Sequence, residues 1–244
     1  MANKLDIVFE NPDIVAVNKE TGLLSIPDRD QSEISLKELL AKKYGKIFTI
    51  HRLDRDTSGL ILYAKNEIAH KYFSTLFSER RVMKTYVGVV VGSMPNEAGS
   101  ILAPIGENPA VKGKMNVHRN GKPSHTDYKV LDGFPQFSIV EFTLHTGRTH
   151  QIRVHTKELG APLVCDPLYG DGKPLLLSDI KKKYRLGKNI EEERPIINRL
   201  ALHSYRLQLK LQDDSDLTLE APLPKEFVAV ANQLRKANDK RKML

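Results

Sequence analysis

Short apolar segments typical of β-strands recur along the whole chain, and helix-like segments come between them without regular alternation. The strand-like segments cover residues 7–9, 14–17, 59–64, 85–91 and 137–145. In the last of these, Ser138, Val140, Phe142 and Leu144 fall on one face, as in a strand with one buried side. Strict alternation would indicate a doubly wound sheet or a barrel of eight strand–helix units, whereas this irregular mixture predicts an α+β fold.

Capping residues mark where helices begin. Ser35 stands three residues before Glu38, which is the spacing of a capping box, and Asn66 can cap a second helix. A third helix is predicted to end at Gly160, which can adopt the backbone conformation of a helix C-terminus. The second helix has an apolar face that consists of Ala69, Tyr72, Phe73, Leu76 and Phe77.

Composition narrows the class of protein. The 244 residues, 40% hydrophobic and 28% charged, suit one large globular domain or two small ones. The single cysteine, Cys165, excludes an intramolecular disulfide framework and indicates a reducing compartment. No apolar run approaches the roughly 18 residues of a membrane span, and the first residues lack the apolar stretch of a signal peptide. We therefore expect a cytoplasmic protein, and a monomer because no apolar stripe is left over.

The charge balance points to an anionic partner. Lysine and arginine number 38 against 30 acidic residues, which leaves a net charge of +8. A polyphosphate backbone is the commonest partner for such a surface. Basic residues gather in two irregular segments, 92–123 and 171–199. We expect exposed turns with a short hairpin in the first, and in the second either a surface insertion or a segment that becomes ordered on binding RNA. A final helix is predicted from about residue 226 and gives way to a basic tail, 236–242.

The segment 51–59, His-Arg-Leu-Asp-Arg-Asp-Thr-Ser-Gly, stands directly before an apolar strand. One interpretation is structural, with Asp54 in an ion pair at a turn. The other is that an arginine keeps Asp54 ionised, which leaves a carboxylate able to act as a nucleophile. Spacing alone leaves both open, and it does not distinguish Asp54 from Asp56.

Two further segments carry candidate site residues. Tyr86, at a strand start, can be a half-buried packing residue or can stack on a displaced nucleobase. The segment 145–155 holds Arg148, which suits a carboxylate or phosphate partner, and three histidines. Those histidines stand five residues apart, which is poor spacing for shared metal binding from one helix, so no metal is expected. Cys165 is interpreted as a buried small hydrophobe.

Taken together, five segments resemble the RluA-type RNA pseudouridine synthases. They are His51–Gly59, Lys84–Tyr86, Thr146–His155, Asp166–Gly170 and Arg199–His203, and the similarity runs from about residue 15 to residue 224. The chain also lacks the glycine-rich signatures of dinucleotide and nucleotide binding. The resemblance implies isomerisation of specific uridines in ribosomal or transfer RNA, with no cofactor and no metal.

The resemblance also implies a fold and a set of site residues. The fold is a long, mixed, mostly antiparallel sheet in two halves around a central cleft, so the chain would be one catalytic domain, 1–244, of two subdomains with a basic C-terminal helix and tail, 225–244. Asp54 would be the catalytic aspartate, Tyr86 the tyrosine that packs on the base, and Arg148 the partner of the aspartate. Asp54 would attack either the ribose C1′ or the uracil C6. The residues expected to contact RNA are Arg52, His51, Lys84, Thr149, His150 and Arg153.

The chain departs from the family pattern in places, and other functions stay open. Glu20 stands where many relatives have proline, which we expect to alter only local rigidity. An accessory RNA-binding domain at the N-terminus is not expected, since family-like sequence begins near Val15. One alternative is a noncatalytic RNA-binding or RNA-folding protein on the same scaffold. Another is a glycosidase with Asp54 and Asp56 as paired carboxylates, although their close spacing makes opposed geometry unfavourable.

Overall fold

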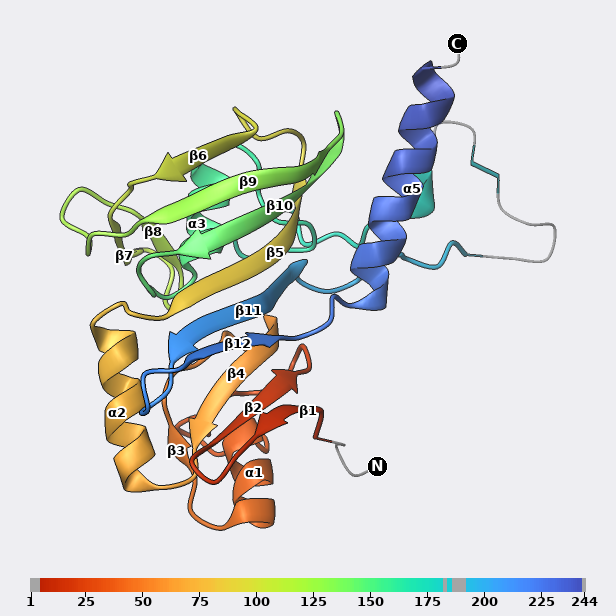
Figure 1. The fold of residues 1–244 in the computed structure, drawn as a ribbon. Helices are drawn as coiled ribbons and strands as arrows, with labels where there is room; N and C mark the ends of the chain where they lie inside the picture. Colours follow the sequence, from red (N-terminus) through yellow and green to blue (C-terminus); the bar gives the residue numbers. More distant parts are fainter. Residues whose placement is uncertain (1–4, 182–183, 186–191, 243–244) are drawn as a thin grey trace. The chain divides into compact units, whose positions relative to one another are not determined.

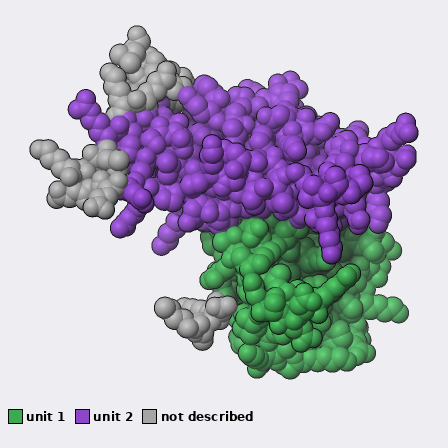
Figure 2. All heavy atoms as spheres, turned by 180° about the vertical axis from the view of Figure 1, so that it is seen from behind, with its two compact units in different colours: residues 1–86, 143–146, 203–222 green, residues 87–142, 147–202, 223–244 purple. Residues whose placement is uncertain are grey.

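The computed structural model describes residues 5–181, 184–185 and 192–242, with the side chains of residues 5–181, 184–185 and 192–237. The chain forms two compact units, coloured separately in Figure 2. Unit 1 comprises residues 1–86, 143–146 and 203–222, and unit 2 comprises residues 87–142, 147–202 and 223–244. Three strands, β5 (Met83–Val91), β10 (Phe137–Leu144) and β11 (Leu202–Lys210), have residues in both units.

Unit 1 contains a mostly antiparallel set of strands in the order β1-β2-β4-β11, with β3 beside β4 and β12 beside β11 (Figure 1). The pairing of β11 with β4 is parallel, whereas β1 with β2 and β2 with β4 are antiparallel. The bounds are β1 Ile7–Glu10, β2 Ile14–Lys19, β3 Phe48–Thr49, β4 Ser58–Ala64, β11 Leu202–Lys210 and β12 Asp216–Glu220, with helices α1 Leu36–Tyr44 and α2 Glu67–Ser78.

Helix α2 covers the main core of unit 1. Asn66 caps it, since its side-chain oxygen accepts a hydrogen bond from the Ala69 N–H at 2.8 Å. Ala69, Phe73 and Leu76 are buried against the sheet, as the apolar periodicity predicts, and Tyr72 and Phe77 are partly buried beside them. The capping box predicted for α1 is also present between Ser35 and Glu38. The sheet residues of this core are Ile14, Ala16, Leu60, Leu62, Ala64, Leu207, Leu209 and Leu219.

Unit 2 has the strand order β5-β10-β9-β6 and a separate two-stranded sheet, β7-β8. On β10, Ser138, Val140, Phe142 and Leu144 are buried, which confirms the predicted face, and Ile139 is buried as well. The bounds are β6 Ala98–Ile101, β7 Ile105–Glu107, β8 Met115–Val117, β9 Thr126–Gly133, α3 Gln151–Glu158, α4 Leu177–Ile180 and α5 Lys225–Lys242.

The C-terminal helix differs from the sequence expectation. Helix α5 continues to Lys242, whereas the basic segment 236–242 was expected to leave the helix. This segment contains neither glycine nor proline and consists mainly of good helix formers, so nothing in its backbone chemistry ends the helix earlier. Part of the second irregular segment, including Lys182, Lys183 and Lys188, lies outside the described residues.

The α+β prediction with a large, mostly antiparallel sheet is confirmed. Of the helices within the described part of the chain, none has both the length and the apolar character needed to cross a membrane.

Candidate active site

The loop that carries Asp54 lies in unit 1, and a buried lysine binds its backbone. The side chain of Lys19, at the end of β2, is almost fully buried, and its ammonium donates to the backbone carbonyls of Arg55 (2.8 Å), Leu23 (2.8 Å) and Glu20 (2.9 Å). Burying a charge is costly unless it is hydrogen-bonded. These carbonyls offset that cost and tie the Asp54 loop to the segment that follows β2.

A second set of bonds fixes the residue before Asp54. The Ser25 hydroxyl donates to the Leu53 carbonyl at 2.8 Å and accepts from the Leu53 N–H at 3.1 Å. The Tyr63 hydroxyl in turn donates to the Ser25 carbonyl at 2.6 Å. After Asp54, its carbonyl accepts the Thr57 N–H at 3.2 Å and closes a turn. The backbone of Asp54 is therefore fixed on both sides, which is the preorganisation that a reacting carboxylate needs.

Gly59 explains how the Asp54 loop enters β4. It has φ 109°, and a Cβ built there would lie 2.2 Å from the Ser204 carbonyl oxygen. Only glycine permits this close approach of β4 to the parallel strand β11. Beside it, the Ser58 hydroxyl lies 2.9 Å from Nδ1 of the buried His203. The last residue of the segment 199–203 thus contacts the last part of the segment 51–59.

Tyr86 lies in unit 1, near enough to Asp54 for the charge of Asp54 to affect its phenol. Burial raises the pKa of the Tyr86 phenol to about 12; a hydrogen bond with Ser204 offsets a part of this effect, and the negative charge of Asp54 adds to it. The phenol is therefore protonated at neutral pH, and the residue as a whole is buried. This arrangement suits packing against an uncharged ring better than proton abstraction by a phenolate.

His51 serves the loop as an anchor. Its Nε2 accepts the Leu62 N–H at 3.0 Å, and its ring stacks on Phe77 with centroids 4.4 Å apart. Burial, with a smaller effect of the Lys84 charge, lowers the His51 pKa to about 3. His51 is neutral at physiological pH and presents no positive charge to a phosphate.

Lys84 and Arg52, the two other predicted RNA-contacting residues of this unit, differ in exposure. Lys84 is buried, and burial together with the charge of Arg80 lowers its pKa. Arg52 is exposed, so its guanidinium can reach a ligand.

Arg148 belongs to unit 2, in the turn before α3. Its N–H donates to the Gln151 side chain at 3.0 Å, and its Nε donates to the Pro123 carbonyl at 3.2 Å. Gln151 is itself buried and donates to the Thr126 hydroxyl at 2.8 Å. The Arg148 turn is thereby attached to the start of β9, while Thr149 at its tip is exposed. The predicted pairing of Asp54 with Arg148 joins residues of the two units and stays a prediction.

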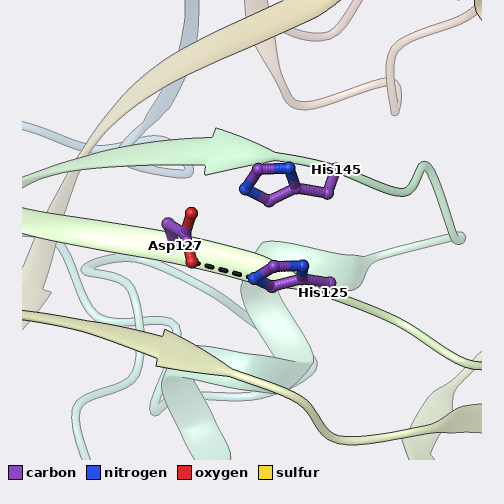
Figure 3. A group of neighbouring side chains, drawn as sticks. All are labelled: His125, Asp127 and His145. Atoms are coloured by element: carbon purple, nitrogen blue, oxygen red, sulfur yellow. Dashed lines mark hydrogen bonds and ion pairs between the residues drawn. The ribbon is translucent and has the colours of Figure 1, made fainter.

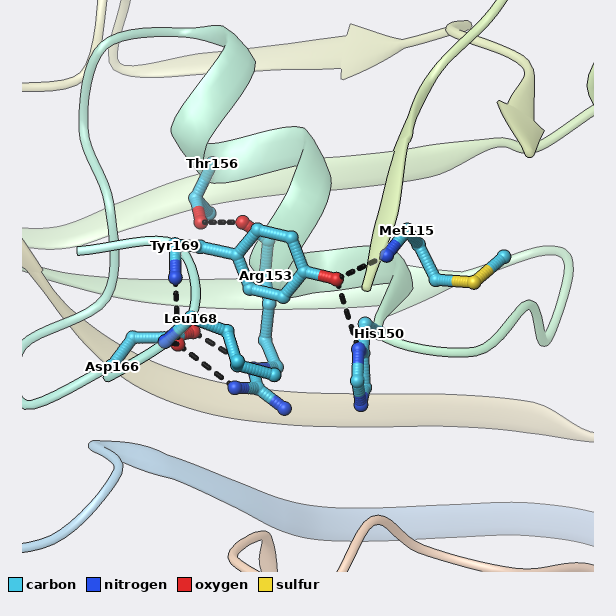
Figure 4. Close-up of polar contacts among 7 residues, drawn as sticks. All are labelled: Met115, His150, Arg153, Thr156, Asp166, Leu168 and Tyr169. Atoms are coloured by element: carbon cyan, nitrogen blue, oxygen red, sulfur yellow. Dashed lines mark hydrogen bonds and ion pairs between the residues drawn. The ribbon is translucent and has the colours of Figure 1, made fainter. Parts of the chain in front are cut away.

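Arg153 is part of a buried network that no pattern in the sequence predicts. Its Nε and its terminal nitrogen each donate at 2.8 Å to one oxygen of Asp166, and both side chains are almost completely buried. The guanidinium also lies under the Tyr169 ring, 5.1 Å from its centroid (Figure 4). Sequence spacing does not reveal such a contact between a helix and a later loop.

At the start of β9, His125 Nε2 lies 2.9 Å from a carboxylate oxygen of Asp127 (Figure 3). Imidazole and carboxylate are groups that divalent metals bind, and here they are joined to each other by this hydrogen bond. Figure 3 also draws His145, which follows β10 directly. The absence of a metal from the reaction remains an expectation.

Cys165 lines a cavity of about 700 Å³ in unit 2, together with Val91, Phe137 and Leu175. Burial raises the pKa of its thiol, and the sulfur donates to the Ile197 carbonyl at 3.4 Å. Both facts support the interpretation of Cys165 as a small buried residue. None of the predicted site residues lines this cavity.

Comparisons with known proteins bear on the whole chain. A family model described as RNA pseudouridylate synthase matches residues 13–158. An uncharacterized RNA pseudouridine synthase of Bacillus subtilis, YhcT, is 33% identical over 92% of this chain and 70% of its own length. The ribosomal large subunit pseudouridine synthase D of Buchnera aphidicola is 38% identical over 91% of this chain and 71% of its own length.

Solved structures show the same similarity. The human RNA pseudouridylate synthase domain containing 4 matches with a TM-score of 0.73 and 25% identity, over 94% of this chain and 93% of that one. The human RNA pseudouridylate synthase domain containing 1 matches with a TM-score of 0.71 and 28% identity, over 92% of this chain and 85% of that one.

Proposed function

This chain belongs to the RNA pseudouridine synthase family, whose members isomerise uridine in RNA, and from this premise we propose that ribosomal RNA is its substrate and Asp54 its nucleophile. The choice of ribosomal RNA over transfer RNA rests on relatives named as ribosomal large subunit pseudouridine synthases. The single cysteine supports the cytoplasm as the place of this reaction.

The observation that carries the assignment of Asp54 is the double anchoring of its loop. Lys19 holds the carbonyl after Asp54, and Ser25 holds the residue before it. A nucleophile that must attack a sugar or base carbon gains most when its position is fixed in advance. Asp56 lies in the same loop, where its carbonyl accepts the Thr21 hydroxyl at 2.7 Å, so a change of its side chain serves as a control for Asp54.

The reaction requires a sequence of bond changes. The N1–C1′ bond of the uridine breaks, the detached uracil rotates, and a C5–C1′ bond forms while C5 loses its proton and N1 gains one. Asp54 attacks either C1′ or C6 during this exchange, and Arg148 is proposed to stabilise its negative charge. The protonated Tyr86 is proposed to pack on the base while it is detached.

The target uridine must first leave its helical stack, which costs a few kcal/mol. The net charge of +8 favours binding of the phosphate backbone and can offset a part of this cost. For direct RNA contact we propose the exposed residues Arg52 and Thr149. For the buried Lys84 and for His150, which contacts the Tyr169 hydroxyl, we propose positioning roles instead. His51 is neutral and accepts a backbone N–H, and Arg153 is paired with Asp166. These contacts support positioning roles for the two residues.

Release of tritium from RNA labelled at uracil C5 tests this proposal, because C5 loses its hydrogen only when the base is rejoined. The wild type is expected to release tritium from unmodified large-subunit ribosomal RNA, and Asp54→Asn to lower the rate more than about a thousandfold, the scale of losing a nucleophile. Asp56→Asn is expected to keep the rate within about threefold of the wild type. It removes the same charge from the same loop as Asp54→Asn does, but it leaves the proposed nucleophile in place.

Other results would redirect the assignment. An Asp56→Asn variant as inactive as Asp54→Asn would remove the specific role of Asp54. Preferential release from transfer RNA would replace the proposed substrate. Release by neither protein, with RNA binding intact, would favour a noncatalytic RNA-binding protein.

A further inference from the structure

Asp166 is the centre of a buried set of hydrogen bonds in unit 2. Its two carboxylate oxygens accept from the Arg153 guanidinium, and one of them also accepts the N–H groups of Leu168 at 2.9 Å and Tyr169 at 3.1 Å. The Gly170 N–H donates to the Asp166 carbonyl at 2.9 Å and closes the turn. The carboxylate therefore satisfies the buried cation and shapes the turn that carries Tyr169.

This turn places Tyr169 between three elements. The ring packs with Ile105 on β7 and Val154 on α3, above the guanidinium of Arg153. The hydroxyl accepts the Met115 N–H of β8 at 2.8 Å and lies 2.9 Å from His150 Nδ1 (Figure 4). The hydroxyl thus joins the start of the β8 strand to the residue before helix α3.

His150 is held in a conformation that its neighbours must maintain. It has φ 55°, in the left-handed region, and no side chain caps the helix that begins after it. A residue other than glycine stays there only when surrounding contacts determine it. The contact with the Tyr169 hydroxyl is such a contact, together with the edge-on packing of the two rings, whose centroids are 5.6 Å apart.

The conformation of His150 in turn determines where Arg148 lies. The turn 148–151 is closed by two bonds, from the Arg148 N–H to the Gln151 side chain at 3.0 Å and from the Gln151 N–H to the Arg148 carbonyl at 3.2 Å. His150 lies inside this closed turn, so a change in its backbone moves Arg148 as well.

We infer that Tyr169 is a positioning residue, which acts through His150 to hold the Arg148 turn in its working conformation. This inference rests on the proposed role of Arg148 as the partner of the nucleophile. Asp166 and Arg153 support it by fixing Tyr169 from the opposite side. The hydroxyl of Tyr169 is the decisive group, because the ring packing does not require it.

The variant Tyr169→Phe removes this hydroxyl and keeps the ring. We expect the single-turnover rate of tritium release to fall about tenfold, since a misplaced catalytic group costs rate more than binding. The dissociation constant for RNA is expected to change less than about twofold, measured by filter binding. Tyr72→Phe is the matched control, because the Tyr72 hydroxyl donates to the Leu211 carbonyl at 2.7 Å in unit 1, away from this network. It is expected to leave both quantities unchanged.

A double-mutant cycle tests whether Tyr169 acts through Arg148. Arg148→Lys keeps a positive charge but loses the shape of the guanidinium. In the Arg148→Lys background, adding Tyr169→Phe is expected to lower the rate by less than about a further twofold, because the guanidinium that Tyr169 positions is already absent. A full tenfold loss in that background would show that Tyr169 acts independently of Arg148 and would overturn the inference.

Amide hydrogen exchange gives a second readout that does not depend on catalysis. Exchange of residues 148–151 is expected to be faster in Tyr169→Phe than in the wild type and unchanged in Tyr72→Phe. Unchanged exchange in Tyr169→Phe, or a wild-type rate of turnover, would overturn the positioning role. Absence of tritium release from the wild type would instead contradict the proposed function, and exchange would still decide whether Tyr169 holds the turn.

Discussion

Some residues of the 51–59 segment stabilise the loop, and others are exposed and can contact a ligand. His51 accepts a backbone N–H and stacks on Phe77, whereas Arg52 is exposed. Two neighbouring basic residues thus have opposite roles. The difference lies in burial, which sequence order alone does not express.

The depressed pKa of His51 predicts a pH dependence of stability. Its pKa is about 3 in the folded protein against about 6.5 when unfolded, so the unfolded chain binds the proton more readily. The stabilising contribution is complete above pH 6.5 and is lost progressively as the pH falls toward 3. Between pH 7 and pH 5 the free energy of unfolding is expected to drop by on the order of 1–2 kcal/mol from this residue.

Urea unfolding of the wild type and of His51→Gln at both pH values measures this effect. The glutamine oxygen can still accept the Leu62 N–H but does not titrate in this range. The variant is expected to lose the part of the pH dependence that belongs to residue 51. If the free energy of unfolding fell equally between pH 7 and pH 5 in the two proteins, His51 would not be buried in its neutral form.

At the scale of elements, the close approach of β4 and β11 depends on a single missing side chain. Gly59 faces the Ser204 carbonyl, and the two strands are parallel at this point. The same contact brings Ser58 to His203. The conformation in which the Asp54 loop enters β4 and the position of β11 therefore depend on each other.

The variant Gly59→Ala is expected to lower the free energy of unfolding by about 3 kcal/mol, because both strand backbones must move to accommodate the methyl group. Gly45→Ala is the matched control: its φ of 77° is also positive, but nothing lies within 4 Å of the added carbon. It should cost only about 1 kcal/mol of backbone strain. Similar losses in chemical denaturation of the two variants would show that φ, and not contact with Ser204, requires glycine at 59.

The sequence predicts the elements better than the contacts between them. Helix α2 and the buried face of β10 follow from local periodicity, which acts within a few residues. The contacts of Lys19 with Arg55 and of Tyr169 with His150 join segments far apart in the chain, and no local pattern encodes them. Sequence patterns therefore predict no role for Lys19 or Tyr169, and the family resemblance predicts an RNA contact for Arg153, which in the structure pairs with Asp166.

For the whole molecule, the charge of +8 predicts RNA binding that weakens as salt rises. Arg52→Ala is expected to reduce the slope of log affinity against log salt by about 0.7, the contribution of one phosphate contact on a single strand. Arg206→Ala is the control, because Arg206 is paired with Glu220 on the neighbouring strand. Filter binding at several salt concentrations measures both. Equal slopes for wild type and Arg52→Ala would exclude Arg52 from phosphate contact.

The division of the chain into two units has a consequence for its synthesis. Unit 1 is assembled from residues 1–86, 143–146 and 203–222, so its strands β11 and β12 leave the ribosome only after nearly all of unit 2. Until then Gly59 has no strand to approach, and Ser58 has no histidine to contact. The loop that carries Asp54 is translated early, but the sheet into which it leads is completed almost last. A nascent chain therefore carries Asp54, the proposed nucleophile, long before it carries the strands β11 and β12 that complete the sheet beside it.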